Sequence, residues 1–248
     1  MAEAAVSLDP RFRVELIAAT PNPQQCVYAG MHQDYSEGFV AADRANWPDE
    51  TQAGEICVKR LLAGERGHYG PLEHAQIVLN VGWFPHSVMQ QARTHRVGVS
   101  FDVQSMRYTG ERICRAARGE LELEEVFYLR PVCDYSDRKG KKYHYSIEQR
   151  AIDLELCRAA AERYRDLLAA GFAEEHARGI LPFDYRQHFV VSFTLRALLH
   201  FLDLRAKLDA QQEIRELCDL IWPHLQAWAP QFADWYEKSR LHKARLAP

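Results

Sequence analysis

The 248-residue sequence lacks the long apolar runs that mark membrane-spanning and secreted proteins. No run approaches the roughly 20 residues that a helix needs to cross a bilayer, and residues 1–13 contain no apolar core of a signal peptide. The sequence also lacks a strong charge of one sign, since its formal net charge is -3 at pH 7. A domain that binds nucleic acid usually carries a broad basic face, so we expect neither a membrane segment nor a nucleic-acid partner.

Paired cysteines and the usual cofactor fingerprints are also missing. The six cysteines lie far apart with no C-x-x-C pair, which favours a reducing cytoplasm as the location. The loop 64–74, GERGHYGPLEH, spaces its glycines as G-x-x-G-x-x-G after a helix-like segment, whereas a dinucleotide fingerprint needs G-x-G-x-x-G after a strand. Its His68 and His74 stand outside any H-E-x-x-H context, so we expect loop hydrogen bonds from them and no metal site.

The chain does contain enough apolar residues, 47%, for the substantial core of a single domain over 1–248. Alternation predicts strands at 13–20, 75–83, 97–101, 124–130 and 189–195. Helical spacing predicts helices at 50–63, 85–93, 173–178, 196–205 and 214–228, the last kinked at Pro223, with one long helix at 146–170. We expect loops at 20–30 and 134–142. Because no βαβ rhythm appears, the sequence predicts an α+β fold with a mainly antiparallel sheet.

The stretch 90–107, QQARTHRVGVSFDVQSMR, combines three arginines, a histidine, three amides and two serines with almost no acid. Arg93, His95 and Arg96 are planar and mostly cationic donors, and arginine forks suit two-pronged contacts with phosphate. The pattern therefore indicates an anion-binding site. A solvated basic helix end beside an acidic neighbour is the ordinary alternative.

This stretch resembles the signature of the flavin-dependent thymidylate synthases, which is Arg-His-Arg, then seven or eight residues, then Ser-x-Arg-Tyr. Here Thr94, His95 and Arg96 are followed by eight residues and then by SMRY at 105–108. GHYGPLEH resembles the family's G-H-x-x-P-x-E-H loop, and EEHARGILP and SFTLRALLHFLDLRA match two further family segments. The resemblance spans about residues 50 to 220.

The chain departs from the family pattern at four positions. Thr94 stands where the first signature arginine is usual, and the adjacent Arg93 is expected to supply that guanidinium. Asp102 and Val103 replace a frequent Asn-Glu, and Gly70 replaces a frequent threonine.

The resemblance implies an enzyme that transfers a methylene group from methylenetetrahydrofolate to dUMP. FAD, reduced by NADPH, then supplies the hydride that completes dTMP, and the family is homotetrameric. Another FAD- or nucleotide-binding enzyme on the same scaffold remains the alternative.

The resemblance also assigns residues. The implied dUMP-binding residues are Gln91, Arg93, Ser105, Arg107, Arg178 and Arg205. The implied FAD-binding residues are His68, Thr94, His95, Arg96, Arg196 and His200. Arg205 is the implied catalytic residue, because its charge stabilises negative charge on the uracil ring.

Two of these assignments can be argued further from the residues. Ser105 is expected to bind the nucleotide rather than to attack it, because the sequence offers no Ser-His-acid set to activate a serine. Arg196 and Arg205 are nine residues apart on one predicted helix, which is two and a half turns, so they should point to opposite sides and serve different ligands.

Overall fold

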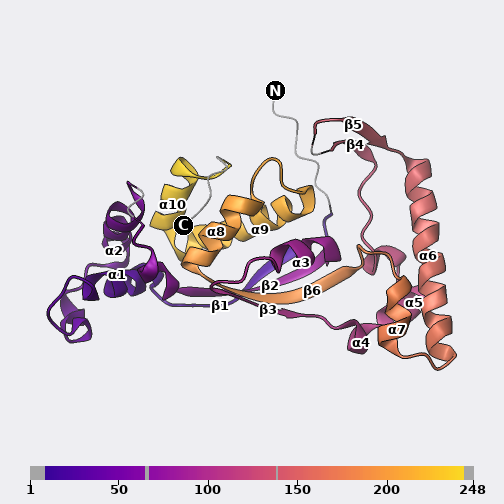
Figure 1. Cartoon of the computed structure of the whole chain (residues 1–248), viewed down its shortest axis with the longest axis horizontal. Helices are drawn as coiled ribbons and strands as arrows, with labels where there is room; N and C mark the ends of the chain where they lie inside the picture. The colour runs from indigo at the N-terminus through magenta and orange to yellow at the C-terminus, as the bar shows by residue number, and fades with distance from the viewer. Residues whose placement is uncertain (1–8, 65–66, 138, 243–248) are drawn as a thin grey trace. The chain divides into compact units, whose positions relative to one another are not determined.

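The computed structural model describes residues 9–64, 67–137 and 139–242 (Figure 1). These residues form two compact units, each assembled from segments that are distant in sequence. The first unit contains the described residues within 1–13, 81–91 and 102–189, and the second contains those within 14–80, 92–101 and 190–248. The single domain expected over the whole chain stays a prediction.

The larger sheet has four strands in the order β1-β2-β6-β3, and its residues are divided between the two units. Its strands are β1 (Arg13–Ala19), β2 (Gln76–Pro85), β6 (Arg186–Thr194) and β3 (Val99–Val103). In β2 the fully buried Ile77, Leu79 and Val81 alternate with more exposed neighbours, which is the pattern that predicted the strand. The predicted α+β class is confirmed, and four of the five predicted strands occur within a few residues of their expected bounds.

The long helix of the first unit, α6 (Ile147–Ala169), confirms the helix expected at 146–170 (Figure 1). A capping box starts it: the Gln149 amide donates to the Ser146 hydroxyl, and the Ser146 amide donates to the Gln149 side chain, each at 3.3 Å. Gly171, with a φ of 85°, follows its end. The helix packs on α5 (Glu111–Ala117), with Ala161 and Tyr164 fully buried.

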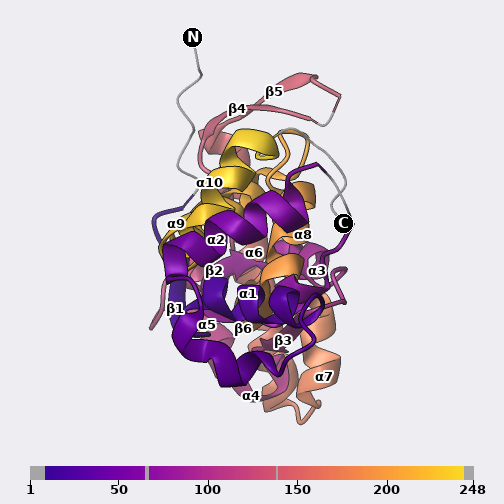
Figure 2. The same ribbon diagram turned by 90° about the vertical axis from the view of Figure 1, so that its left-hand side faces the viewer.

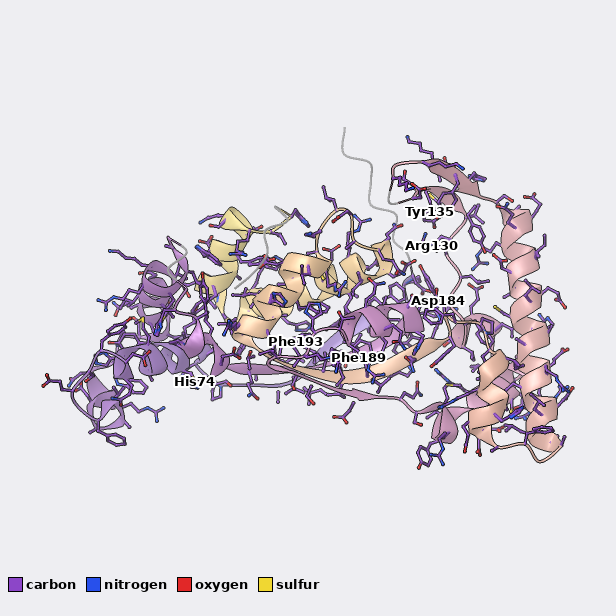
Figure 3. All side chains as sticks on the ribbon, in the orientation of Figure 1. His74, Arg130, Tyr135, Asp184, Phe189 and Phe193 are labelled. Atoms are coloured by element: carbon purple, nitrogen blue, oxygen red, sulfur yellow. The ribbon has the colours of Figure 1, made fainter. Side chains whose placement is uncertain are left out.

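The first unit also contains several short helices and a fully buried arginine. The helices are α3 (His86–Ala92), α4 (Met106–Thr109), η4 (Leu123–Glu125), α7 (Glu174–Ala177) and η5 (Arg178–Ile180). Arg186 is fully buried; it pairs with Asp9 and donates to the carbonyl oxygens of Glu124 at 2.6 Å and Trp83 at 2.7 Å. Asp184 accepts a hydrogen bond from the Ser87 amide at 3.1 Å and so holds the start of α3 (Figure 3).

The strand expected at 124–130 is wrong. Residues 126–128 are all buried, so their apolar character reflects burial on every side and not the alternation of a strand. They make one isolated bridge, between Phe127 and Tyr185. The Glu124 carbonyl, which would otherwise continue the hydrogen-bond ladder of a strand, accepts a hydrogen bond from the Arg186 side chain.

The loop expected at 134–142 is also wrong, because most of it belongs to a hairpin. Strands β4 (Cys133–Ser136) and β5 (Lys142–Tyr145) pair antiparallel, and residue 138 lies outside the described residues. The Asp137 carboxylate accepts the amides of Lys139 and Lys141, at 2.8 and 2.9 Å, and this closes the turn. Arg130 lies over the ring of Tyr135 at 5.2 Å (Figure 3).

In the second unit, the loop expected at 20–30 is instead mostly the helix α1 (Pro23–Gln33). Pro23 begins this helix rather than breaking the chain, because proline is favoured in the first turn. The carboxylate of Glu50 accepts the amides of Gln24 and Gln25 at 2.8 and 2.9 Å. A cap supplied from 26 residues away leaves no local signal in the sequence.

Helix α2 (Glu50–Cys57) packs beside α1 (Figure 2) and continues into η2 (Val58–Leu62), a single π turn. Together they confirm the helix expected at 50–63. The second unit also contains η1 (Val40–Asn46), η3 (Gly70–Glu73), α8 (Leu195–Arg205), α9 (Gln212–Trp228) and α10 (Pro230–Ser239). Helices α8 and α9 confirm two further predictions, α10 was not predicted, and Pro223 lies inside α9. No helix among the described residues is long and apolar enough to span a bilayer.

One buried carboxylate joins α8 to the C-terminal helix. Asp203 of α8 accepts from Arg240 through Nε at 3.2 Å and Nη2 at 3.0 Å, and from the Tyr236 hydroxyl at 3.0 Å. Burial raises the pKa of Asp203, while the bonds from Arg240 and Tyr236 oppose that rise. A buried charge with three such bonds fixes the rotation and height of α8.

Replacing Asp203 with alanine should lower the free energy of unfolding by roughly 3–5 kcal/mol, because it removes the carboxylate that balances a buried guanidinium. Urea denaturation measures this. The matched control is Asp234→Ala, which breaks an exposed pair with Lys238 and should cost less than about 1 kcal/mol. Equal losses in the two variants would contradict the role given to Asp203.

Candidate functional site

The centre of the candidate site in the second unit is Arg205, the last residue of α8. Its Nε donates to His95 Nε2 at 3.0 Å, and its Nη2 donates to the Thr94 hydroxyl at 2.6 Å. The structure thus brings together two of the signature residues and the implied catalytic arginine. Because two hydrogen bonds hold the guanidinium group, the orientation of its plane is fixed.

His95 must be neutral for this contact, because a guanidinium can donate only to an unprotonated imidazole nitrogen. Since Nε2 accepts from Arg205, the proton of the ring lies on Nδ1. His95 is buried, and this burial, followed by the charge of Arg205 and by His200, lowers its pKa to about 4. Burial also lowers the pKa of Arg205, although a guanidinium stays charged at neutral pH.

His200 lies one turn before the end of α8 and packs edge-on against His95, with ring centroids 5.4 Å apart. Its Nδ1 is buried and has no hydrogen-bond partner among the described residues. Buried polar atoms are almost always paired, so this nitrogen is a position where a bound molecule would complete the hydrogen bonding. The implied flavin residues therefore include one unsatisfied polar atom.

Arg196 lies near the other end of α8 and has different partners. Its Nη1 donates to Glu73 at 3.1 Å, and its guanidinium lies 6.0 Å from the centroid of the Tyr69 ring. The second oxygen of Glu73 accepts from Thr194 at 3.0 Å. Arg196 and Arg205 thus have different partners in the structure, and the expectation that they serve different ligands stays a prediction.

Gly98 allows the backbone to lie close to the ion pair of Glu73 and Arg196. Its φ is 67°, and its carbonyl accepts the amide of Thr194 at 2.8 Å. A Cβ at this position would lie 2.5 Å from the Thr194 hydroxyl and 3.1 Å from a Glu73 carboxylate oxygen. Only glycine combines this backbone conformation with this close approach.

Three other implied residues of the second unit are exposed. His68 contacts Asp34 through Nε2 at 2.8 Å, which is the loop hydrogen bond expected from its context. Arg93 and Arg96 are exposed, and within the described residues neither forms an ion pair. Both arginines lie just beyond the end of α3 at Ala92, so a solvated basic helix end stays the alternative to an anion-binding site for these two residues.

The remaining implied residues belong to the first unit. Ser105 caps α4, with its hydroxyl accepting the Arg107 amide at 3.4 Å. Arg107 is exposed and lies 3.5 Å from a Glu175 carboxylate oxygen, while Arg178 is exposed at the junction of α7 and η5. Gln91 is half-buried in α3. Which ligand each residue binds stays a prediction.

Several residues that order the site were not among those assigned from the sequence. Glu73 stood inside the GHYGPLEH motif, so its position was visible but its two partners were not. Thr194 shows only the pattern of a helix cap, which it also is, accepting the Ala197 amide at 3.2 Å. Asp34 lies in no motif at all. Among the described residues, no group of three His, Cys, Asp or Glu side chains is placed to hold a metal ion.

Comparisons with known proteins give a consistent family. Residues 15–231 match the family model Thy1, described as thymidylate synthase complementing protein. The flavin-dependent thymidylate synthase of Halobacterium salinarum is 33% identical over 247 residues, covering 95% of this chain and 100% of that protein. The enzyme of the same name from Haloarcula marismortui is 34% identical, covering 95% and 99%.

Two solved structures show the same fold. Thymidylate synthase X from Helicobacter pylori, solved with FAD and dUMP, has a TM-score of 0.66 at 18% identity and covers 90% of this chain and 96% of its own. The UMP/dUMP methylase PolB from Streptomyces cacaoi, bound with 5-Br dUMP, has a TM-score of 0.73 at 21% identity and covers 96% and 97%.

The low pKa of His95 predicts a specific pH dependence of stability. The folded-state pKa of about 4 lies below the ordinary 6.5, so the stabilisation is present above about pH 6.5 and is lost as the pH falls through about 4. Below both values the loss relative to a non-titrating residue should reach roughly 3 kcal/mol. Urea unfolding of the wild type and His95→Gln from pH 7 to 4 measures it. A stability difference that does not change with pH would contradict the neutral His95.

Proposed function

Because the chain belongs to the thymidylate synthase complementing protein family, we propose that it is a flavin-dependent thymidylate synthase that converts dUMP to dTMP with FAD. The observation that carries this proposal is the contact of Arg205 with His95 and Thr94. It joins the signature to the arginine of a separate family segment, more than a hundred residues away in sequence.

The residues present fit a flavin nucleotide. FAD carries a pyrophosphate, and Arg96 offers an exposed guanidinium group without an ion-pair partner among the described residues. His200 offers the unsatisfied ring nitrogen. When bound, the flavin supplies the hydride, and the task of this chain is to bind and orient its partners.

Arg205 has the role of an electrostatic stabiliser. The uracil ring of dUMP gains negative charge as it becomes a nucleophile, and a fixed guanidinium lowers the energy of that state without reorganising. The bonds to His95 and Thr94 hold Arg205 in place before the substrate binds. Neutral His95 adds no second positive charge beside it.

The remaining implied residues would bind the nucleotide. Arg93, Arg107 and Arg178 are exposed cations suited to the phosphate of dUMP. The Ser105 hydroxyl accepts an amide at its own helix start and keeps its proton to donate to a ligand. Gln91 is assigned to the same nucleotide by its place in the family pattern.

The fuller reaction is part of the same proposal. Methylenetetrahydrofolate would supply the one-carbon unit, NADPH would reduce the flavin, and the active enzyme would be a homotetramer. A cytoplasmic location agrees with six cysteines that are all free thiols.

The direct test is to incubate the purified, FAD-loaded protein with dUMP, methylenetetrahydrofolate and NADPH and to measure dTMP by chromatography. We expect dTMP to form, with NADPH oxidation stimulated by dUMP. A parallel reaction with UMP separates this activity from a broader uridylate methylation. A yellow protein that forms no dTMP would support a different flavin enzyme on the same scaffold.

Arg205→Lys should retain bound FAD and NADPH oxidation, while dTMP formation falls about tenfold to a hundredfold. Lysine keeps the charge, but its ammonium cannot reproduce the planar fork that spans His95 and Thr94. Flavin absorbance and dTMP yield are measured on the same preparation. Arg165→Lys, at an exposed pair with Asp166, serves as the control. Near-normal dTMP output from Arg205→Lys would remove Arg205 from the reaction.

Arg93→Ala should weaken the binding of FAD or dUMP about tenfold to a hundredfold and leave the unfolding free energy nearly unchanged, because Arg93 is exposed. Thr94→Ala should affect ligand binding much less, because the Thr94 hydroxyl contacts Arg205 and carries no charge. Calorimetry with each ligand measures both. Equally small effects in the two variants would show that Arg93 does not replace the missing signature arginine.

A further inference from the structure

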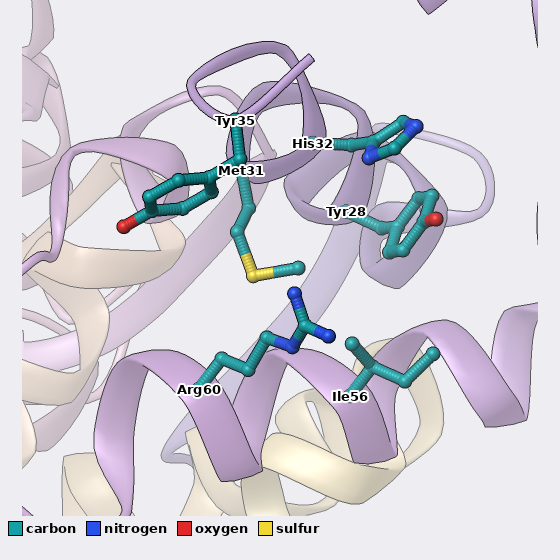
Figure 4. Close-up of a pocket in the computed structure, with 6 residues that line it drawn as sticks. All are labelled: Tyr28, Met31, His32, Tyr35, Ile56 and Arg60. Carbon is teal, nitrogen blue, oxygen red and sulfur yellow. The ribbon is translucent and has the colours of Figure 1, made fainter.

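A cavity of about 150 Å³ in the second unit lies between α1 and the α2–η2 segment (Figure 4). Its walls are Tyr28, Met31 and His32 of α1, Tyr35 just beyond that helix, and Ile56 and Arg60 from the facing segment. No step of the proposed reaction has used any of these side chains.

The walls of the cavity are suited to a flat ring. Tyr28 and His32 are stacked, with ring centroids 5.3 Å apart and an interplanar angle of 21°. Met31 is 1% exposed, and its thioether forms a soft inner surface of the kind that packs well on aromatic rings. Tyr35 is 70% exposed, so the cavity is accessible from solvent at that side.

Arg60 gives the cavity a positive charge. Its guanidinium points toward Met31 and the Tyr28 ring in Figure 4, and within the described residues it has no ion-pair partner. Arg60 lies in the π turn η2, where the Ala63 amide donates to the Val58 carbonyl at 2.8 Å. Such π turns are rare and occur frequently at functional sites.

These features define the class of ligand. A cavity of this volume accommodates one benzene-sized ring, and an arginine in its wall is suited to bind a carboxylate through two parallel hydrogen bonds. The ligand that fits is therefore a single aromatic ring carrying an acidic group.

The cavity also lies beside a residue already assigned to the cofactor. The ring of Tyr35 is 6.1 Å from the ring of His68, and His68 contacts Asp34. We propose that the cavity binds the p-aminobenzoylglutamate portion of the folate co-substrate, with the benzoyl ring between Tyr28 and Tyr35 and a glutamate carboxylate on Arg60. This inference rests on the proposed function, which requires a folate.

The first test uses p-aminobenzoyl-L-glutamate as the probe in calorimetry with the purified full chain. Wild-type protein should bind it saturably, and Arg60→Gln should bind it about tenfold more weakly or worse, since a charge-assisted contact is lost. Lys59→Gln, which removes the same charge from the neighbouring exposed residue, is the matched control and should bind like the wild type. Thermal denaturation checks that both variants are folded. Equal binding by the two variants, or no saturable binding to the wild type, would overturn the proposal.

AMP, which offers a two-ring base and a phosphate, distinguishes a folate fragment from an adenine nucleotide. Weaker, Arg60-independent AMP binding supports the folate assignment, whereas tighter, Arg60-dependent AMP binding overturns it.

The second test compares steady-state kinetics of Arg60→Gln and Lys59→Gln. The KM for methylenetetrahydrofolate should rise about tenfold in Arg60→Gln, with the KM for dUMP unchanged. An unchanged folate KM with normal dTMP formation would overturn the cavity assignment and leave the enzyme function intact. Arg60-dependent probe binding to a protein that forms no dTMP would overturn the enzyme function and leave the cavity as a site for aromatic acids.

Discussion

The orientation of α8 depends on a carboxylate that touches no ligand. Asp203 is buried and accepts three hydrogen bonds from Arg240 and Tyr236 of the C-terminal part of the chain. The same helix carries Arg196, His200 and Arg205. A buried ion pair adds little net stability compared with apolar packing, but it permits only one geometry. The accuracy with which Arg205 is held therefore originates in a contact between two helices behind the site.

A second constraint is the difference in burial among the arginines of the site. Arg205 is half-buried and faces a histidine that burial keeps neutral, whereas Arg93 and Arg96 are exposed. The half-buried Arg205 thus donates to the neutral acceptors His95 and Thr94, and the exposed cations are left to attract anions from solution. Thr94 contributes to this arrangement, because a hydroxyl accepts from Arg205 where a signature arginine would repel it. The departure from the family pattern is chemically consistent with its neighbour.

The sequence predicted those parts of the fold whose signal is local. Helix α6 has a capping box and a glycine stop, and β2 has regular alternation, so both were found. Helix α1 was missed because its N-terminal amides are capped by Glu50, which is distant in the chain. The site residues were identified by contiguous motifs, but their partners were not: Glu73 and Arg196 are 123 residues apart, and no periodicity links them. The cavity around Arg60 was invisible for the same reason.

Gly98 shows how this architecture restricts the variation open to the chain. Strand β3 begins at the next residue, Val99, and none of its residues has a positive φ. At position 98 the smallest possible addition, one methyl group, would meet both the Thr194 hydroxyl and the carboxylate that Arg196 binds. A substitution there would act on two polar side chains at once and would also require a strained backbone. Glycine is therefore favoured at position 98 on two independent grounds, the left-handed backbone and the lack of room for a Cβ beside the Glu73–Arg196 ion pair.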